Sequence, residues 1–518
     1  MKSLAVIYHL ARADFLERVR RYSFLIMLGA VLFLGYQAAV GNVTLQLGDY
    51  RGEFNSAWVG SMMAIIASFF LGWFGFYLVK GSLARDRETG VGQIMATTPL
   101  TRPLYTLGKW LSNFTVLFLT VAILALVGLA LQLFAGESDQ FDFTAFFAPF
   151  LFVALPMLAL TAALAVFFEC VGFTQGGFGN LLYFFLFGLV ISLAVTSGKE
   201  NPLLDLPGFH TLSESMGAAA KAAYPGYDGS FVLGSTGTPI LGTFPWSGVT
   251  WTANTILIRL MILCLGIILA LVSSILFDRF DTSRRKMGRT KNAASSPEPE
   301  IAPAKQTASQ PVRLTPLTKS TSHFAFIRIL VSELKLLLKG KHWWWYVIAG
   351  GLFIVSLISK PEDVHAFILP ITWLWPVLIW SGLGGHEIRN NTQQLVFSSA
   401  APLVRQLPAS WLAGFSIALL TGGGAVLKLS IAGDGVGLLP WISAALFIPS
   451  FALAAGVWSN SNKLFEVAFV AMWYLAMNGL PEFDFFGATS NGNPGFYIPL
   501  SLALILAAFI GRARQLQN

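Results

Sequence analysis

The chain of 518 residues is 55% hydrophobic and only 12% charged, and its mean hydropathy is +0.65. Soluble domains carry about 25% charged residues, so this composition excludes an ordinary soluble protein and indicates an integral membrane protein. The formal net charge is +8, but the Lys and Arg residues lie in short segments between apolar runs. This distribution is typical of membrane topology and argues against nucleic-acid binding. Cys170 and Cys264 lie in or beside apolar runs, which predicts buried thiols and neither a disulfide framework nor a metal site.

Apolar runs of membrane length recur along the whole chain. A transmembrane helix needs about 20 apolar residues, and the sequence predicts about twelve such spans. The predicted spans cover residues 22–40, 57–80, 108–135, 144–170, 178–196 and 251–277 in the first half, and 343–359, 365–385, 408–432, 438–458, 463–480 and 495–511 in the second. We therefore expect an all-α polytopic membrane protein built as two pseudo-repeated bundles of about six helices each.

Three regions are predicted along the chain. Residues 1–280 form a first transmembrane domain with a long external loop at 197–250, and residues 323–518 form a second transmembrane domain. Between them, residues 281–322 begin with basic residues and continue into a stretch rich in Pro and small polar residues. Such a stretch cannot bury enough apolar area to offset its chain entropy, so we expect a disordered cytoplasmic linker.

The charges in the predicted loops indicate the orientation in the membrane. One side carries the basic residues Arg85, Arg87, Arg102, Lys109, Arg279, Arg284, Arg285, Lys286, Arg289, Lys291, Arg512 and Arg514. The other side carries the acidic residues Asp49, Glu53, Glu137, Asp139, Asp142, Glu482 and Asp484. Because cytoplasmic loops are enriched in Lys and Arg, we expect a multi-pass protein of the cell (inner or plasma) membrane with both termini in the cytoplasm.

Each half opens with a segment whose apolar residues recur at helical spacing. The first stripe consists of Leu4, Tyr8, Ala11, Phe15, Val19 and Tyr22, with Arg12 and Arg20 outside it. The second consists of Ile327, Leu330, Val331, Leu334, Leu337 and Leu338, with Arg328, Lys335 and Lys339 elsewhere. An apolar face beside a basic one favours an elbow helix that lies in the membrane interface. The alternative is that both segments are the cytoplasmic starts of the following spans.

The cytoplasmic segment from Arg85 to Lys109 is much longer than a simple hairpin between spans requires. It begins with the charged turn RDRE, breaks at Gly90, and continues with apolar residues at helical spacing. Pro99 is expected to end this helix, because the residue before a proline disfavours the α conformation. A short helix at the membrane surface could serve as a contact for a partner, and the alternative is a solvated loop without one.

The second half contains a related segment at residues 386–415. Pro99-Leu100 matches Pro402-Leu403, and Arg102 matches Arg405. After a slip of two residues, Trp110 and Phe114 match Trp411 and Phe415. Duplicated bundles with a cytoplasmic segment at the same place favour a pseudosymmetric transporter.

With these elements the sequence resembles the permease subunits of ATP-binding cassette (ABC) exporters of the type-2 class. The resemblance rests on the stripe at residues 4–22, on Glu88-Thr89-Gly90, on the string from Thr98 to Arg102 and on the external loop. It implies a coupling helix in each half that contacts an ATPase. The residues that it assigns to this contact are Arg85, Asp86, Arg87, Glu88, Gly90, Pro99, Arg102, Arg389, Pro402 and Arg405. The second half departs from the pattern, with Asn391-Thr392-Gln393 in place of Glu-Thr-Gly.

The resemblance also implies a separate source of energy. The chain contains no phosphate-binding G-x-x-x-x-G-K-[ST] string, and no polar stretch is long enough for a nucleotide-binding domain. We expect the chain to be no enzyme and to bind no cofactor itself. ATP and Mg²⁺ would act through one or two ABC ATPase subunits at the cytoplasmic face. The other expected partners are membrane lipids, and the sequence leaves open whether a second permease chain takes part.

Two other classes of function compete with this one. The string from Gly81 to Arg87 is similar to the G-x-x-x-D-R-x-G signature of major facilitator carriers, which also have two six-span halves. Its spacing carries an extra residue, and the loop that follows is too long. A polytopic membrane enzyme is the weaker alternative, since the six His residues show no metal-ligand spacing and no G-x-S-x-G elbow occurs.

Charged residues inside predicted spans are candidates for a transport pathway. These are Glu169, Lys428 and Glu466, although each is close enough to an interface to extend toward water. A pathway lined mainly by Phe, Leu and small residues would suit a lipid-like or amphipathic cargo, or a peptide or drug. The sequence leaves the cargo and the direction of transport open.

Overall fold

The computed structural model describes residues 2–20, 22–39, 44–138, 140–198, 200–227, 229, 231–234, 241–278, 280, 325–341, 343–360, 363–399, 401–433, 435–477, 479–488 and 492–517. The predicted linker at 281–322 lies outside these residues. The chain separates into two compact units, Met1–Arg289 and Thr290–Asn518. Each unit is described by itself below.

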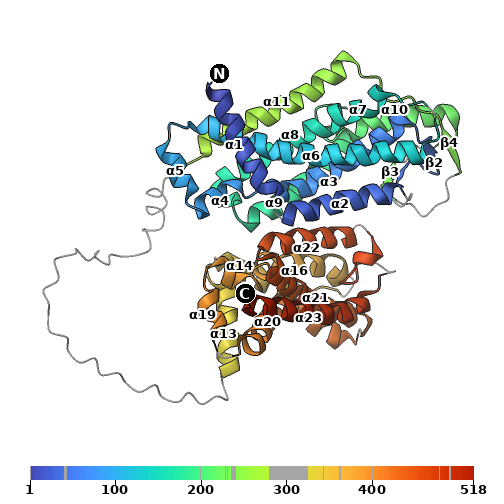
Figure 1. Cartoon of the computed structure of the whole chain (residues 1–518). Helices are drawn as coiled ribbons and strands as arrows, with labels where there is room; N and C mark the ends of the chain where they lie inside the picture. The colour runs from blue at the N-terminus through green and yellow to red at the C-terminus, as the bar shows by residue number, and fades with distance from the viewer. Residues whose placement is uncertain are drawn as a thin grey trace. The chain divides into compact units, whose positions relative to one another are not determined.

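The first unit is a bundle of long apolar helices (Figure 1). Its helices are α1 (Lys2–Val19), α2 (Tyr22–Ala39), α3 (Ser56–Val79), α4 (Ser82–Glu88), α5 (Val91–Thr97), α6 (Arg102–Ala135), α7 (Phe143–Pro149), α8 (Leu155–Cys170), α9 (Gly177–Ser197), α10 (Phe209–Ala223) and α11 (Ala253–Leu276). A π-helical turn, η1 (Phe150–Ala154), joins α7 to α8, and a short 3-10 turn, η2 (Gly172–Thr174), follows α8. The helix α6 packs against α1, α3, α8 and α11, so it lies at the centre of the unit.

Short strands cover one end of the first unit. Strand β1 (Thr44–Gln46) pairs antiparallel with β3 (Val232–Gly234), and β2 (Tyr50–Gly52) pairs parallel with β4 (Gly242–Phe244). These pairs join the loop after α2 to the long loop at 197–250. Figure 1 shows β2 and β4 at the opposite end of the unit from α4 and α5. The sequence analysis predicted the long loop but none of its strands.

The second unit is also helical. Its helices are α13 (Ala325–Leu338), α14 (Trp343–Ile358), α16 (Leu369–Leu374), α17 (Val377–Trp380), α18 (His386–Arg389), α19 (Gln393–Phe397), α20 (Pro402–Ala432), α21 (Gly435–Ser459), α22 (Asn462–Met477) and α23 (Tyr497–Gln517). The π-helical turn η5 (Val364–Ile368) precedes α16, and the 3-10 turns η6 (Pro481–Phe483) and η7 (Pro494–Phe496) precede α23. Helix α20 packs against α13, α14 and α21, as α6 does against its neighbours.

Glycines permit close approach of the helices in both units. A Cβ atom on Gly60 of α3 would collide with the backbone of Phe146, and one on Gly424 of α20 would collide with the backbone of Phe353. In a membrane, where lipid chains are as apolar as the helix surfaces, such close packing drives association between helices. Gly424 belongs to the glycine-rich string at 422–424, which is therefore a packing feature.

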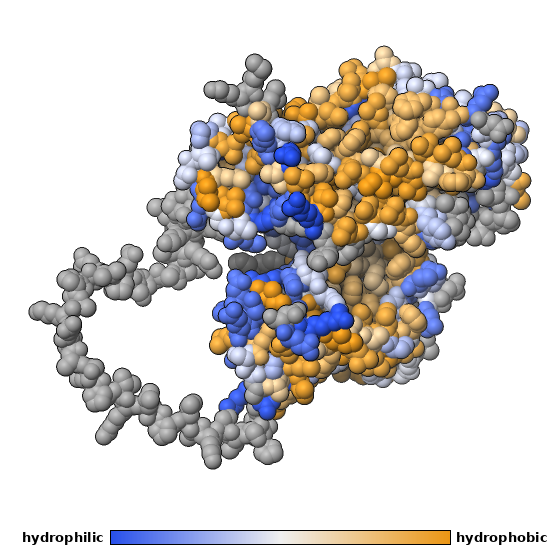
Figure 2. All heavy atoms as spheres, viewed as in Figure 1, coloured by the Kyte–Doolittle hydropathy of each residue, from blue (hydrophilic) through white to orange (hydrophobic). Residues whose placement is uncertain are grey.

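Eight of the described helices are long and apolar enough to cross a membrane: Ser56–Glu88, Arg102–Phe134, Phe143–Cys170, Gly177–Ser197, Ala253–Leu276, Pro402–Ile431, Gly437–Ser459 and Pro494–Gln517. Met27–Ala38, Trp345–Ile358 and Leu369–Trp380 are shorter apolar helices, and the predicted span at 463–480 corresponds to α22. The all-α polytopic membrane fold is confirmed, and the count of twelve stays a prediction. Figure 2 shows hydrophobic residues over the middle of the first unit and hydrophilic residues at its two ends.

The face of α1 that packs on α6 differs from the predicted stripe. Tyr8, which the stripe included, is 59% exposed, whereas Asp14 and Arg18 are buried beside Ala11. The elbow helix in the membrane interface stays a prediction, and the structure adds that Asp14, which lies outside the stripe, faces Lys109 and Ser112 of α6. An ion-pair network between helices holds the charged residues inside.

Candidate functional site

Two short helices follow α3 and precede α6; the second was predicted from the sequence, whereas the first covers residues that were predicted to form a charged turn. Helix α4 begins after Gly81, whose φ of 112° lies in the left-handed region. Gly90, with a φ of 75°, separates α4 from α5, and the extended backbone of Thr98 ends α5 just before Pro99. The predicted break at Gly90 and the predicted helix end before Pro99 are both confirmed. We name Ser82–Thr97 the coupling segment.

Glu169, near the end of α8, holds the start of this segment. Its carboxylate accepts hydrogen bonds from the backbone N–H groups of Ser82, Leu83 and Ala84 at 3.1, 3.3 and 3.3 Å, and only 3% of the residue is exposed. A carboxylate is favourable there because the first N–H groups of a helix lack partners within the helix. Glu169 is therefore an anchor of the coupling segment, where the sequence analysis predicted a pathway residue.

Asp14 joins α1 to α4 and α6. One carboxylate oxygen accepts from Arg85 Nη2 at 2.9 Å and Lys109 Nζ at 3.0 Å, and the other accepts from Arg18 Nε at 3.1 Å and Ser112 Oγ at 2.8 Å. Burial by itself raises the pKa of Asp14, but the charges of Arg18 and Lys109 outweigh burial and hold the pKa below its ordinary value. Asp14 is therefore ionised and fully engaged.

Asp86 belongs to the same buried network. Its carboxylate lies 2.8 Å from Lys109 Nζ and accepts a hydrogen bond from the Tyr105 hydroxyl at 2.7 Å. Since only 6% of Asp86 is exposed, it faces the interior, and the expectation that it contacts a partner is corrected. Arg85 is likewise occupied by acidic residues of α1. Two of the four charged residues of the turn thus bind the coupling segment to its own bundle.

The outward side of the coupling segment is the part that a partner can reach. The Arg87 guanidinium lies 6.0 Å from the centre of the Phe280 ring, and Glu88 is exposed. On α5 the apolar side chains of Val91 and Ile94 point outward, and Ile94 is 68% exposed. These two apolar side chains, three residues apart on α5, form a small apolar surface that a partner can cover.

A small apolar core supports the coupling segment from beneath. It consists of Leu83, Tyr105, Val166, Cys170 and Phe277, with Met95 and Leu100 packed against it. Gly92 of α5 lies so close to Phe280 that a Cβ atom would come within 2.6 Å of its ring. Pro99 and Arg102 are exposed where the segment leads into α6. The segment is thus seated on the bundle, with its far end open to solvent.

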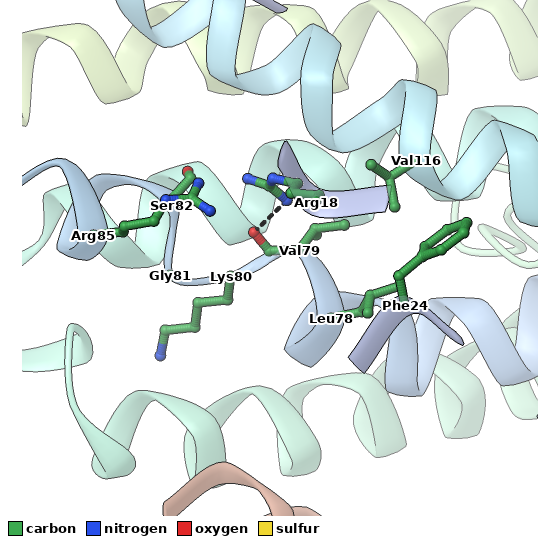
Figure 3. Close-up of a pocket in the computed structure, with 9 residues that line it drawn as sticks. All are labelled: Arg18, Phe24, Leu78, Val79, Lys80, Gly81, Ser82, Arg85 and Val116. Carbon is green, nitrogen blue, oxygen red and sulfur yellow. Dashed lines mark hydrogen bonds between the residues drawn. The ribbon is translucent and has the colours of Figure 1, made fainter. Parts of the chain in front are cut away.

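A cavity of about 30 Å³ adjoins the ion-pair network where α1, α3 and α4 meet (Figure 3). Arg18 reaches into it from α1 and donates to the backbone carbonyl of Val79 at 2.9 Å. Arg85 lines it from α4, whereas Lys80 points away and donates to Asn180 of α9 at 2.7 Å. The cavity has roughly the volume of a single water molecule, so it is too small for a cargo.

The second unit carries a related polar cluster. Glu387 of α18 accepts a hydrogen bond from Gln406 of α20, whose amide also donates to Glu333 of α13 at 3.4 Å. Glu387 follows Asp86 by 301 positions (387 − 86), and Gln406 follows Tyr105 by the same 301 (406 − 105). An acidic residue of the turn before the long helix therefore contacts the start of that helix in both units.

The tryptophans near the start of α6 and α20 are separated by the same offset of 301 positions. Trp110 donates to a backbone carbonyl of α8 at 3.0 Å, and Trp411, 301 positions later (411 − 110), donates to a hydroxyl of α21 at 2.9 Å. Each stacks on the Phe four residues further along. The prolines are not equivalent, because Pro99 precedes α6 whereas Pro402 is the first residue of α20. The spatial repeat therefore follows the tryptophan match.

The second cluster has a different charge balance. At the offset of 301, Ser410 is the position equivalent to Lys109, so the second cluster has no lysine there. Glu387 pairs instead with Arg512 of α23 at 3.1 Å. Burial raises the pKa of Glu333, and the neighbouring charge of Glu387 raises this pKa further. The second unit thus holds an acidic pair that resists double ionisation.

The remaining predicted residues lie apart from one another. Arg389 donates to two backbone carbonyls of the preceding turn, at 2.9 Å each, and therefore stabilises that turn. Arg405 is exposed and Pro402 half-buried at the start of α20, and Lys428 is half-buried near the other end of the same helix. On α19, Leu395 is 78% exposed.

Glu466 is buried on α22 and belongs to the electrostatic surroundings of Arg389 and Lys341. Burial lowers the pKa of Lys341, and the charge of Glu466 opposes that shift. The charge of Glu466 acts on Arg389 in the same way. This position favours a role in neutralising nearby cations over the predicted role in a cargo pathway.

One ion pair, at the end of the first unit that lies opposite α4 and α5, was not predicted from the sequence. Arg259 of α11 lies 2.9 Å from the carboxylate of Asp205, and its guanidinium also donates to the Asp205 carbonyl and to the Thr211 hydroxyl. Both charged residues are buried. The signal was present, because Arg259 interrupts an apolar run and an ionisable residue within a span usually has a partner. The pair fastens the external loop to α11.

Residues 8–282 match the family model described as ABC-2 family transporter protein. This range is more than half of the chain, and it contains the coupling segment, the Asp14 network and the external loop. No curated protein matches the chain, and no solved structure matches it.

Proposed function

Because the chain belongs to the family of ABC-2 transporter proteins and is a membrane permease subunit of an ABC transporter, we propose that it exports an amphipathic cargo with ATP hydrolysed by a separate subunit. In this proposal ATP and Mg²⁺ are bound by the partner, on the cytoplasmic side of the cell membrane. Membership of this family argues against the two alternatives, a major facilitator carrier and a polytopic membrane enzyme.

The observation that carries the proposal is the outward face of α5. It presents Val91 and Ile94 to solvent beside the exposed Glu88, while the rest of the coupling segment is anchored to the bundle. In protein interfaces a few buried apolar or aromatic anchors carry most of the binding free energy. We assign Ile94 as such an anchor for the ATPase, and Leu395 of α19 as its counterpart in the second unit.

The ion-pair network supplies the route by which movement of the ATPase reaches the membrane helices. A displacement of α5 moves α4, whose Asp86 is bound to Lys109 of α6 and whose Arg85 is bound to Asp14 of α1. Glu169 adds α8 to the same connection. The coupling segment is therefore attached by charge-assisted bonds to three helices, which lets it move them together.

The cargo class follows from the composition of the bundles. The described helices present mostly apolar side chains at membrane depth, with the half-buried Lys428 of α20 as an exception. A lipid-like or amphipathic molecule can enter such surroundings without the cost of burying its own charge. A peptide or drug with an apolar face would meet the same requirement.

The assignment of Ile94 can be tested by adding a charge at this position. Ile94→Glu should weaken co-purification with the ATPase by about tenfold or more, since 1.4 kcal/mol corresponds to a factor of ten in affinity. Leu241→Glu is the matched control, because Leu241 is also 68% exposed but lies at the external end. Equal loss of the ATPase in both variants, or in neither, would contradict the proposed contact. Leu395→Glu tests the second unit in the same way.

A further inference from the structure

A second cavity of the first unit lies between α6 on one side and α7, η1 and α8 on the other, away from the coupling segment. Its volume is about 450 Å³, within the range of about 300–1,000 Å³ that is typical of small-molecule sites. Phe118 and Ala122 line it from α6, and Phe147, Leu151 and Leu155 line it from the opposite side. Thr144 is the only polar residue among those that line it.

The cavity extends over one half of the membrane. From Phe143 at the external start of α7 to Leu155 at the start of α8 the helix rises about 18 Å, at 1.5 Å per residue. The hydrocarbon core of a bilayer is about 30 Å thick, so one leaflet contributes about 15 Å. The length of the cavity therefore corresponds to one acyl chain of the external leaflet.

The two ends of the cavity differ in polarity. At the external end, the Thr144 hydroxyl donates to the carboxylate of Asp142, and both residues are exposed. Toward the middle of the membrane, the lining consists of residues such as Phe118, Ala122 and Leu155. A polar rim above an apolar channel matches a molecule with a headgroup and a hydrocarbon tail.

The π-helical turn η1 explains why a hollow exists here. Phe150–Ala154 form a wider turn than an α-helix, and Pro149 and Pro156 on either side remove backbone donors. In this stretch, residues four apart, such as Phe147, Leu151 and Leu155, lie along one wall. π-helical turns are rare and frequently mark functional sites, and this one lies against the cavity.

The side chains at the mouth of the cavity face the lipid. Phe118 is 46% exposed and Leu151 is 54% exposed, and both lie within helices that cross the membrane. At that depth the surrounding medium is hydrocarbon, and an apolar hollow excludes water. We propose that this cavity binds one acyl chain of a phospholipid from the external leaflet, with the headgroup at the rim formed by Asp142 and Thr144.

The proposal can be tested with the full chain in phosphatidylcholine vesicles that contain a trace of phosphatidylcholine with a diazirine in the middle of one acyl chain. After illumination, lipid adducts are mapped by peptide mass spectrometry. We expect adducts on residues 118–125 and 143–155. The double variant Ala122→Phe, Ala148→Phe fills the cavity, and labelling there should fall by about tenfold, which corresponds to about 1.4 kcal/mol of binding free energy.

Two controls separate a bound lipid from lipid that merely surrounds the protein. Ala130→Phe adds the same side chain to an exposed position of α6 outside the cavity, and it should leave labelling unchanged. Adducts on the exposed face of α11, at Leu265 and Ile268, should be equal in all variants. Phe147→Ala enlarges the cavity, should raise labelling there, and serves as the test if the filled variant does not fold.

Two results would overturn the proposal. If the filled variant is labelled at residues 118–125 and 143–155 as strongly as the natural chain, the lipid lies on the surface and not in the cavity. If these residues escape labelling in the natural chain while α11 is labelled, protein covers the cavity and no lipid chain enters it.

Discussion

The buried carboxylate of Asp14 offers the sharpest test of how the coupling segment is held. Asp14→Asn keeps the size of the side chain but removes the negative charge that faces Arg18, Arg85 and Lys109. It also replaces a carboxylate oxygen, which accepts hydrogen bonds, with an amide NH₂ group, which donates them. Lys109, whose side chain is 2% exposed, then depends on Asp86 alone for an ion pair.

The expected cost can be worked out from the burial of these groups. Removing one partner of a buried ion pair costs about 3–5 kcal/mol, because the remaining charge stays buried. A change of 1 kcal/mol shifts the melting temperature of a domain of 150–250 residues by about 2–4 °C. We therefore expect Asp14→Asn to lower the melting temperature of the first unit by about 6 °C or more.

The assay is thermal unfolding of the purified full chain, with Glu17→Gln as the control. Glu17 lies on the same helix and also pairs with Arg85, but its side chain is 47% exposed, and exposed pairs contribute only about 0–1 kcal/mol. If Asp14→Asn melts within the error of Glu17→Gln, the idea that the buried network stabilises the segment is refuted. Restored stability in Asp14→Asn, Asp86→Asn, Lys109→Met would instead support it, since the buried cation and both of its carboxylate partners are then removed together.

Two further predictions concern other parts of the chain. Arg259→Met leaves the buried Asp205 without its cationic partner at a cost of about 3–5 kcal/mol, so protease added from outside should cut residues 203–223 faster. Leu257→Met, at an exposed position on the same helix, is the control. Equal cutting rates in the two variants would count against the anchoring role. Glu333 has a pKa raised above the ordinary 4.5 by burial, so the folded chain binds this proton more tightly than the unfolded chain, and stability should fall as pH rises from about 4.5 through the raised pKa. Glu333→Gln should remove that part of the pH dependence, and melting curves of the two proteins that change in parallel with pH would contradict this.

Much of the coupling segment was predictable from local sequence. Gly90 sets the break between α4 and α5, and Pro99 sets the end of α5, because glycine tolerates the left-handed conformation and proline restricts the residue before it. The apolar face of α5 followed from residues at helical spacing. The direction in which the charged turn points was not predictable, because Arg85, Asp86, Arg87 and Glu88 look alike as a string of charges. Their surroundings alone distinguish the buried Asp86 from the exposed Glu88.

The roles of Asp14 and Glu169 were hidden for a related reason. Asp14 lies on a helix that appeared to have its charges on the outer side, and its partners Arg85 and Lys109 are 71 and 95 positions away. Glu169 lies at the end of an apolar run, where a carboxylate can face water, a cargo or a helix N-terminus. No local pattern decides among these, since the N–H groups that it binds belong to a turn 85–87 positions earlier.

The sequence by itself determined that the chain crosses a membrane many times and that a short helix follows the second span. Both conclusions rest on properties of contiguous residues: apolar length sets what lipid accepts, and glycine and proline set where helices break. The tertiary structure decided which charges are buried, which of the two sequence matches between the halves the spatial repeat follows, and where a cavity lies beside η1. These features depend on which helices pack together, and close packing brings distant residues within hydrogen-bonding distance in ways that local periodicity does not encode.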